Sequence, residues 1–262
     1  MSVAKVASAA ALATGVLGGG GYLIYDNLID TETRLLAYSS DFEKTYTDAN
    51  SFGRKYGIYL LDPDSSKNKD VWSALFNKWS KDKETKDNNR YENFKKTKID
   101  KSFGADNKAL NQVCKSSFKE ANFNNKDKYE ENIWAFCSIF EAKPKMVSSS
   151  ETTYSNKFGT KAEHNGKLVS VKSEDDTSNN SFWDRRNKEF FGEVRYGNSG
   201  SKASDGSIFK TLYNKKDRGA DDTVKKTCEK AYLTETTGTQ SNKFTDADLK
   251  LFCYLIPEKT SQ

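Results

Sequence analysis

The chain has a single histidine, His164, among 262 residues, and this scarcity limits the catalytic chemistry that it can support. A serine or cysteine nucleophile activated by a histidine base would have to use this one residue. His164 lies in the polar, turn-like segment 162–166, where we expect an exposed loop side chain. The Gly/Ser-rich stretch 197–202 has the wrong order of residues for a phosphate loop. The sequence therefore predicts no catalytic residue and no cofactor.

Cysteine is also scarce: the chain has four, none before Cys114 and none in a C-x-x-C pair. The first observation excludes a lipoprotein signal, and the second argues against a zinc site. The cysteines form two pairs, each about two dozen positions apart, and this spacing favours the disulfides Cys114–Cys137 and Cys228–Cys253 in an oxidising compartment. Buried reduced thiols are the alternative, because a cysteine beside phenylalanine in an apolar run is also ordinary core.

Charges of one sign are little concentrated along the chain, apart from the short basic stretch at residues 95–101, which we expect to be an exposed loop. The 42 basic and 37 acidic residues are intermixed and leave a net charge of +5. This pattern is typical of a solvated surface and predicts no nucleic-acid partner. Hydrophobic residues make up 35% of the chain and aromatic residues 13%, so aromatic side chains are expected to dominate small cores.

The longest uncharged run lies near the N-terminus. Residues 6–25 contain no charge, and about twenty helical residues can cross a hydrocarbon core of roughly 30 Å. We interpret the run as a transmembrane anchor after a cytoplasmic N-terminus, residues 1–5; a cleaved secretory signal or a buried helix are the alternatives. Lys5 precedes the run and acidic residues follow it, which predicts a single-pass protein of the cell membrane with the bulk of the chain extracellular.

Small residues recur at every fourth position of this run, at Ala7, Ala11, Gly15 and Gly19. On a helix they would line one face and allow two membrane helices to approach closely, which predicts self-association. The alternative is that an Ala/Gly-rich composition produces this spacing by chance.

A series of landmarks occurs twice in the same order. The first series is Thr45-Tyr46, Phe52-Gly53, Trp72, Cys114, Phe136-Cys137 and Pro144, and the second is Thr153-Tyr154, Phe158-Gly159, Trp183, Cys228, Phe252-Cys253 and Pro257. The recurring residues are mainly aromatic residues, cysteine, glycine and proline, which are typical of cores and turns. The sequence thus predicts two tandem repeat units, residues 45–147 and 148–262. The repeated aromatic residues expected in their cores are Trp72, Trp183, Phe136 and Phe252.

The predicted fold class is mainly α. Apolar residues at spacings of three and four predict a stalk helix at residues 26–44, helices around both repeated tryptophans, and helices around the first cysteine of each unit. The apolar runs 133–140 and 249–256 are predicted as helices that stop before a proline. The polar stretches 81–106 and 192–222 are predicted as long loops or poorly ordered insertions.

The N-terminal layout carries a resemblance. The chain begins Met-Ser-Val-Ala-Lys-Val, continues with an Ala/Gly-rich segment that ends in four glycines and Tyr22, and then becomes rich in Lys and Asn with Trp and Phe-Cys motifs. This layout resembles the paralogous families of uncharacterised membrane-anchored proteins of haemotropic mycoplasmas. The resemblance implies an outward-facing protein of a wall-less bacterium that lives on red blood cells.

These observations predict a surface-anchored, non-enzymatic protein that acts as an adhesin or a variable surface antigen. Its expected partners are the membrane and host cell-surface or serum proteins. The alternatives are a cell-envelope enzyme or accessory factor with an unrecognised site, and a scaffold that faces the cytoplasm.

Overall fold

The computed structural model describes residues 33–86, 90–123, 126, 128–140, 142–236 and 243–258. The α-helices are α2 (Phe42–Thr45), α3 (Phe52–Tyr56), α4 (Lys69–Lys86), α5 (Leu110–Ser117), α6 (Tyr129–Cys137), α7 (Asp176–Phe191), α8 (Ile208–Asn214), α9 (Val224–Tyr232) and α10 (Asp246–Phe252). The 3-10 helices are η1 (Leu36–Tyr38), η2 (Ser66–Asn68), η4 (Glu92–Phe94), η6 (Thr152–Tyr154), η7 (Phe158–Thr160), η8 (Ala162–His164), η9 (Ser173–Asp175) and η10 (Gly200–Lys202). Over these residues β-structure is limited to isolated bridges, so the predicted mainly helical class is confirmed.

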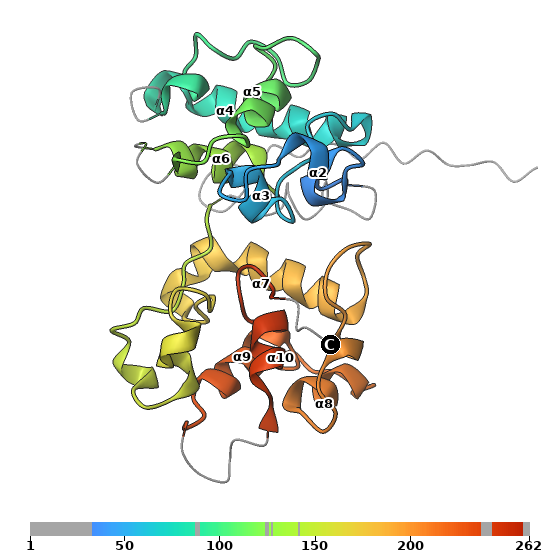
Figure 1. Ribbon diagram of the computed structural model, residues 1–262, viewed down its shortest axis with the longest axis vertical. Helices are drawn as coiled ribbons and strands as arrows, with labels where there is room; N and C mark the ends of the chain where they lie inside the picture. The colour runs from blue at the N-terminus through green and yellow to red at the C-terminus, as the bar shows by residue number, and fades with distance from the viewer. Residues whose placement is uncertain are drawn as a thin grey trace, which may run out of the picture.

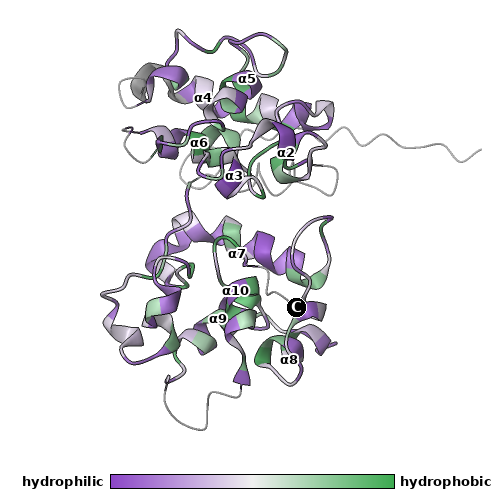
Figure 2. Ribbon diagram, viewed as in Figure 1, coloured by the Kyte–Doolittle hydropathy of each residue, from purple (hydrophilic) through white to green (hydrophobic). Residues whose placement is uncertain are grey.

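The helices form two lobes stacked along the long axis (Figure 1). The first lobe contains α2 to α6 and the second contains α7 to α10. Helix α7 lies on the side of the second lobe that faces the first. Coloured by hydropathy, the ribbon is apolar on parts of α6, α8 and α10 and mostly polar along the outer loops (Figure 2).

A buried asparagine fixes the start of the long helix in each lobe. The Asn68 side chain accepts a hydrogen bond from the Arg34 amide and donates to the Arg34 carbonyl, both at 2.8 Å. Asn179 does the same with Lys145, accepting from its amide at 2.7 Å and donating to its carbonyl at 3.0 Å. Because the amide side chain satisfies both backbone groups of an extended segment, each asparagine is tolerated at 0% exposure.

The repeated tryptophan follows four positions after each asparagine. Trp72 and Trp183, which the sequence places in the core, are 0% and 3% exposed. The Trp183 indole donates to the Ser170 carbonyl at 3.0 Å, whereas the buried Trp72 indole N–H has no hydrogen-bond partner in the part of the chain that the structure describes. Phe136 and Phe252 are also buried.

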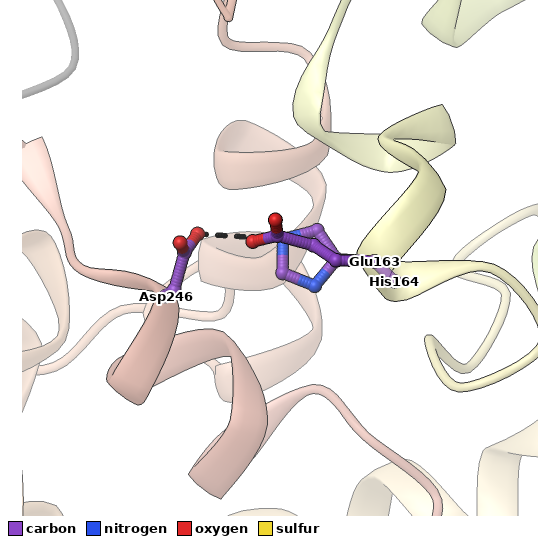
Figure 3. A group of neighbouring side chains, drawn as sticks. All are labelled: Glu163, His164 and Asp246. Carbon is purple, nitrogen blue, oxygen red and sulfur yellow. Dashed lines mark ion pairs between the residues drawn. The ribbon is translucent and has the colours of Figure 1, made fainter.

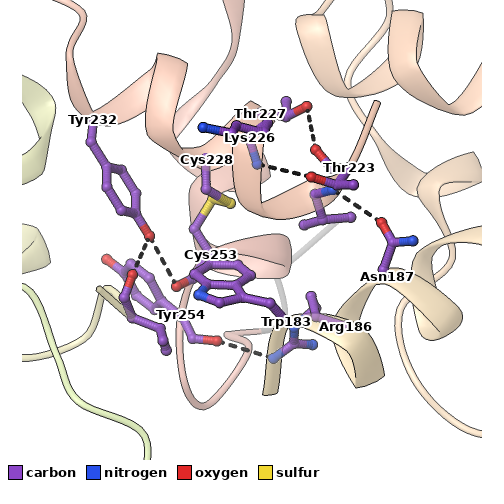
Figure 4. Close-up of a disulfide and its surroundings, with 12 residues drawn as sticks. Trp183, Arg186, Asn187, Thr223, Lys226, Thr227, Cys228, Tyr232, Cys253 and Tyr254 are labelled. Atoms are coloured by element: carbon purple, nitrogen blue, oxygen red, sulfur yellow. Dashed lines mark hydrogen bonds between the residues drawn. A yellow bond between two sulfur atoms is a disulfide. The ribbon is translucent and has the colours of Figure 1, made fainter. Parts of the chain in front are cut away.

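All four cysteines of the chain form disulfides, and the predicted pairing is confirmed. Cys114 on α5 is bonded to Cys137 at the end of α6, and Cys228 on α9 is bonded to Cys253 just after α10. Figure 4 draws the second bond, with Trp183 among its surroundings. Each disulfide therefore joins the last two helices of one lobe.

We expect Cys137→Ala to leave a thiol-reactive Cys114 and to lower the free energy of unfolding by about 3 kcal/mol, the usual contribution of a loop of this length. Urea denaturation of the variant and of unreduced wild type measures the difference. Cys253→Ala is the matched variant in the second lobe and should behave alike. Equal unfolding free energies for wild type and variants, or four titratable thiols in the unreduced protein, would contradict the expectation.

The prediction of a stalk helix at residues 26–44 is wrong where the structure describes this segment, from Thr33 onward. The chain there forms the turn η1 and the one-turn helix α2, not a continuous helix. Leu35 pairs with Leu61 in a β-bridge, and the Leu36 amide donates to the Leu60 carbonyl at 2.8 Å. Leu35 and Leu36 are thereby buried, so the apolar residues attributed to a stalk belong to the core of the first lobe.

The two polar stretches are also more ordered than predicted. Residues 192–222 contain α8, which Ser207 caps by accepting a hydrogen bond from the Lys210 amide at 3.1 Å. Phe209 on this helix is buried, and its ring stacks on that of Phe252. In residues 81–106, α4 continues to Lys86 and η4 buries Phe94. Apolar residues carried within polar sequence fold both stretches back onto the cores.

The predicted anchor, residues 6–25, lies outside the described residues, as does its small-residue face of Ala7, Ala11, Gly15 and Gly19. Within the part of the chain that the structure describes, none of the helices has the length and apolar character needed to cross a membrane.

Candidate functional site

His164 is a buried side chain, and the expectation of an exposed loop histidine is wrong. It ends η8 with 1% of its surface exposed. Its imidazole Nδ1 lies 2.7 Å from the Tyr254 hydroxyl, and the two rings meet edge to face. The ring of Phe158 lies on another side, 6.3 Å away between centroids. The polar sequence around His164 gives no sign of this burial, because the covering residue Tyr254 comes from the far end of the chain.

The other imidazole nitrogen of His164 faces two carboxylates. Nε2 lies 3.4 Å from Asp246 Oδ1 and 3.6 Å from Glu163 Oε1, and each residue offers one ligand atom within 4.8 Å of the others. Figure 3 shows the Glu163 and His164 side chains extending from η8 toward Asp246 at the start of α10. Neither Nε2 nor Asp246 Oδ1 makes a hydrogen bond to the described part of the chain, although both atoms are buried. We call these three residues the Glu–His–Asp cluster.

The position of Asp246 follows from the start of α10. Thr245 and Asp248 form a capping box, in which the Thr245 hydroxyl accepts from the Asp248 amide at 3.2 Å and the Asp248 carboxylate accepts from the Thr245 amide at 2.9 Å. This arrangement fixes the first turn of the helix. Asp246 then occupies the first turn, where the helix dipole favours a negative charge.

Lys161 borders the cluster on its solvent side. Its ammonium lies 3.1 Å from Glu163 Oε1 and 3.5 Å from Asp246 Oδ2, so it pairs with the Asp246 oxygen that does not face His164. About a third of the side chain is exposed. Burial lowers the pKa of His164 below its ordinary value, although the Asp246 and Glu163 carboxylates act in the opposite direction. The net effect favours the neutral imidazole.

A second polar group lies between the two lobes and is centred on Arg186 of α7. Its guanidinium, 1% exposed, donates to the Tyr59 hydroxyl at 2.8 Å, to Glu189 at 3.0 Å and to the Tyr254 carbonyl at 3.1 Å. The Tyr59 hydroxyl in turn donates to the Leu255 carbonyl. Figure 4 shows Arg186 reaching the Tyr254 carbonyl. This Arg186 node joins a residue of the first lobe to two segments of the second.

The outer rim of the same seam carries aromatic side chains. Tyr38 from η1 stacks on Tyr196, which follows α7, with ring centroids 3.9 Å apart and planes within 7°. Tyr38 is 44% exposed, and the Arg195 guanidinium lies 5.5 Å from the Tyr196 ring. We call Tyr38, Arg195 and Tyr196 the seam patch. It presents stacked aromatic faces and a cation to solvent.

The residues singled out from the sequence and those of these sites hardly overlap. The repeated tryptophans, phenylalanines and cysteines lie in the cores. The Glu–His–Asp cluster and the seam patch are formed by residues that are distant in sequence, and among them only His164 has a distinctive place in the sequence, as the single histidine. No protein-family model, curated protein or solved structure matches the chain.

Proposed function

We propose that this chain is a non-enzymatic adhesin of a host-associated, wall-less bacterium, anchored in the cell membrane by residues 6–25, with its two lobes exposed outside the cell. The observation that carries the proposal is the pair of disulfides, which leaves the chain without a free cysteine. Disulfides persist in oxidising surroundings and are rare in reducing cytosol. The extracellular orientation that the N-terminal charges predict agrees with this chemistry.

In this proposal the two lobes are tandem copies of one helical unit. Matching backbone contacts support the duplication: the Leu61 amide donates to the Cys137 carbonyl at 3.1 Å, and the Val169 amide donates to the Cys253 carbonyl at 3.0 Å. The asparagine that precedes each tryptophan also makes the same bonds in each lobe. Since these bonds involve Arg34 in one lobe and Lys145 in the other, we propose that the first unit starts before residue 45 and the second near residue 145.

The repeated glycine has the same role in both units. A Cβ on Gly53 would lie 2.8 Å from the Tyr46 ring, and one on Gly159 would lie 2.6 Å from the Tyr154 ring. Both distances are too short for a side chain, so each glycine allows a tyrosine to pack directly on the backbone. This requirement accounts for the recurring order of tyrosine and glycine and favours common descent over chance.

The seam patch is the surface that we assign to the host protein. Tyrosine and arginine are enriched among the residues that dominate protein interfaces. The rings of Tyr38 and Tyr196 stack on each other across the seam, so both side chains are already ordered. A partner that binds them therefore causes little further loss of side-chain conformational entropy. Tyr38 comes from the first lobe and Tyr196 from the second, so the patch forms only when both lobes are present. In this proposal the two-lobed architecture serves to form the binding surface.

The test is binding of the purified chain from residue 26 onward to host red blood cells. We expect saturable binding that Tyr38→Ser weakens at least tenfold, because the exposed ring is lost and the stack is broken. Leu233→Ser is the matched control, since Leu233 is 41% exposed and lies outside the patch. Equal loss in both variants would contradict the assignment of the seam patch. Absence of saturable binding by the wild-type chain would contradict the adhesin function and favour a variable antigen.

A further inference from the structure

We propose that Glu163, His164 and Asp246 form a binding site for one divalent transition-metal ion of the Zn²⁺ type. One imidazole nitrogen and two carboxylate oxygens are a donor set that such ions accept. The site is independent of the seam patch and of the adhesin proposal. It was not expected from the sequence, because Asp246 lies far along the chain from the other two residues.

Two spacings between the donor atoms fit a tetrahedral ion. With metal–ligand bonds of about 2.0–2.2 Å, neighbouring donors of a tetrahedral site lie about 3.3–3.6 Å apart. His164 Nε2 lies 3.4 Å from Asp246 Oδ1 and 3.6 Å from Glu163 Oε1. These contacts are too long or too poorly aligned for a hydrogen bond at Nε2 but match two edges of the coordination tetrahedron.

The hydrogen bonds behind His164 are compatible with the tautomer that a metal ligand requires. The Tyr254 hydroxyl lies 2.7 Å from His164 Nδ1 and 3.4 Å from the Glu163 carbonyl, so its oxygen can accept from a protonated Nδ1 while its hydrogen points to that carbonyl. In that tautomer Nδ1 carries the proton, and Nε2 presents its lone pair to the carboxylates. A metal-bound histidine usually has its second ring nitrogen fixed in this way.

In this tautomer Nε2 and Asp246 Oδ1 face each other as two acceptors, whereas Glu163 Oε1 is contacted by the Lys161 ammonium. Nε2 and Asp246 Oδ1 are buried and have no hydrogen-bond partner among the described residues, which is unfavourable for both atoms. A metal ion between them would satisfy both. Glu163 and Asp246 each expose nearly half of their side chains, which gives the ion a path from solvent, and water would fill the fourth position.

Lys161 competes with the ion for the two carboxylates. Its ammonium contacts Glu163 Oε1 and Asp246 Oδ2 from the solvent side, and its charge opposes that of an incoming cation. The side chain is partly exposed and can turn into solvent when the ion binds. Removing this charge should therefore strengthen metal binding, an effect that a purely structural role of the cluster does not predict.

The test is a Zn²⁺ titration of the purified full-length chain after treatment with a chelator, followed by calorimetry. We expect one ion per chain. Asp246→Asn and His164→Gln should each weaken the affinity at least tenfold, and Lys161→Met should strengthen it at least threefold. Mg²⁺ is the control ion, and we expect no binding because it prefers an octahedral set of oxygen ligands. Asp246→Asn keeps the shape of the side chain and provides the comparison if His164→Gln does not fold.

Nuclear magnetic resonance gives a second readout, because the chain has only one histidine. In ¹⁵N-labelled protein, Zn²⁺ should shift the His164 Nε2 resonance and leave Nδ1 protonated. The proposal is overturned if Zn²⁺ leaves the imidazole resonances unchanged. It is likewise overturned if folded Asp246→Asn binds as tightly as wild type, or if Lys161→Met fails to bind more tightly.

Discussion

Replacing Arg186 by alanine should lower the free energy of unfolding by about 3–5 kcal/mol, the cost of removing one partner from a buried ionic contact. The substitution leaves the Tyr254 carbonyl without its guanidinium donor and removes the bond to the Tyr59 hydroxyl. Glu189 keeps only its bond from Arg185, at 2.9 Å, and stays buried. Equilibrium denaturation in urea measures the loss.

Two further variants identify the source of this effect. Tyr59→Phe removes only the hydroxyl between Arg186 and the Leu255 carbonyl and should cost about 1 kcal/mol. Arg195→Ala removes an exposed arginine of the same seam and should change stability by less than about 0.5 kcal/mol. If Arg186→Ala is no more destabilising than Arg195→Ala, the Arg186 node does not hold the lobes together.

Trp72→Ala and Trp183→Ala should each cost about 3–5 kcal/mol, because a large buried aromatic side chain is removed and a cavity is left. Phenylalanine substitutions distinguish the two sites. Trp183→Phe also removes the hydrogen bond to the Ser170 carbonyl and should cost about 1 kcal/mol more than Trp72→Phe, since the Trp72 indole N–H has no partner among the described residues. Chemical denaturation followed by circular dichroism compares all four variants.

An alternative interpretation of the repeated tryptophans is an exposed aromatic face that binds a partner. In that case the alanine variants would melt like wild type and lose binding instead. Unchanged melting together with quencher-accessible indoles in wild type would therefore contradict the core assignment. The burial of both side chains favours a loss of stability.

The features that could be predicted from the sequence depend on local patterns. Helical spacing around Trp72 and around Cys114 predicts α4 and α5, because each buried face repeats with the period of the helix. The disulfide pairing follows from the recurring distance between cysteines, since each bond joins two consecutive helices of one lobe. These signals need no knowledge of distant parts of the chain.

The features that were missed depend on contacts between distant segments. Leu35 and Leu36 have spacings compatible with a helix, but pairing with the segment at Leu60 and Leu61 fixes them in an extended conformation and a turn. His164 lies in a polar segment and is buried by Tyr254, which folds over it from the end of the second lobe. No pattern in the neighbouring sequence predicts either contact.

Helix α8 was missed for a different reason, because its signal is present but short. Ser207 is a good N-cap, and Ile208, Phe209 and Leu212 follow it at helical spacing. The surrounding Gly, Ser, Lys and Asp residues dominate any longer window and predict a loop. A seven-residue helix with one apolar face is stabilised by packing on the core, and little by its own propensity.

The most direct test of the central claim, that the two lobes are exposed outside the cell, is lysine labelling of intact cells that express the full chain. A membrane-impermeant amine reagent is applied before and after permeabilisation, and labelled peptides of residues 33–258 are quantified by mass spectrometry, with a cytosolic protein as the control. The account predicts equal labelling of the lobes in intact and permeabilised cells, while the cytosolic control is labelled only after permeabilisation. Labelling of the lobes only after permeabilisation would contradict it.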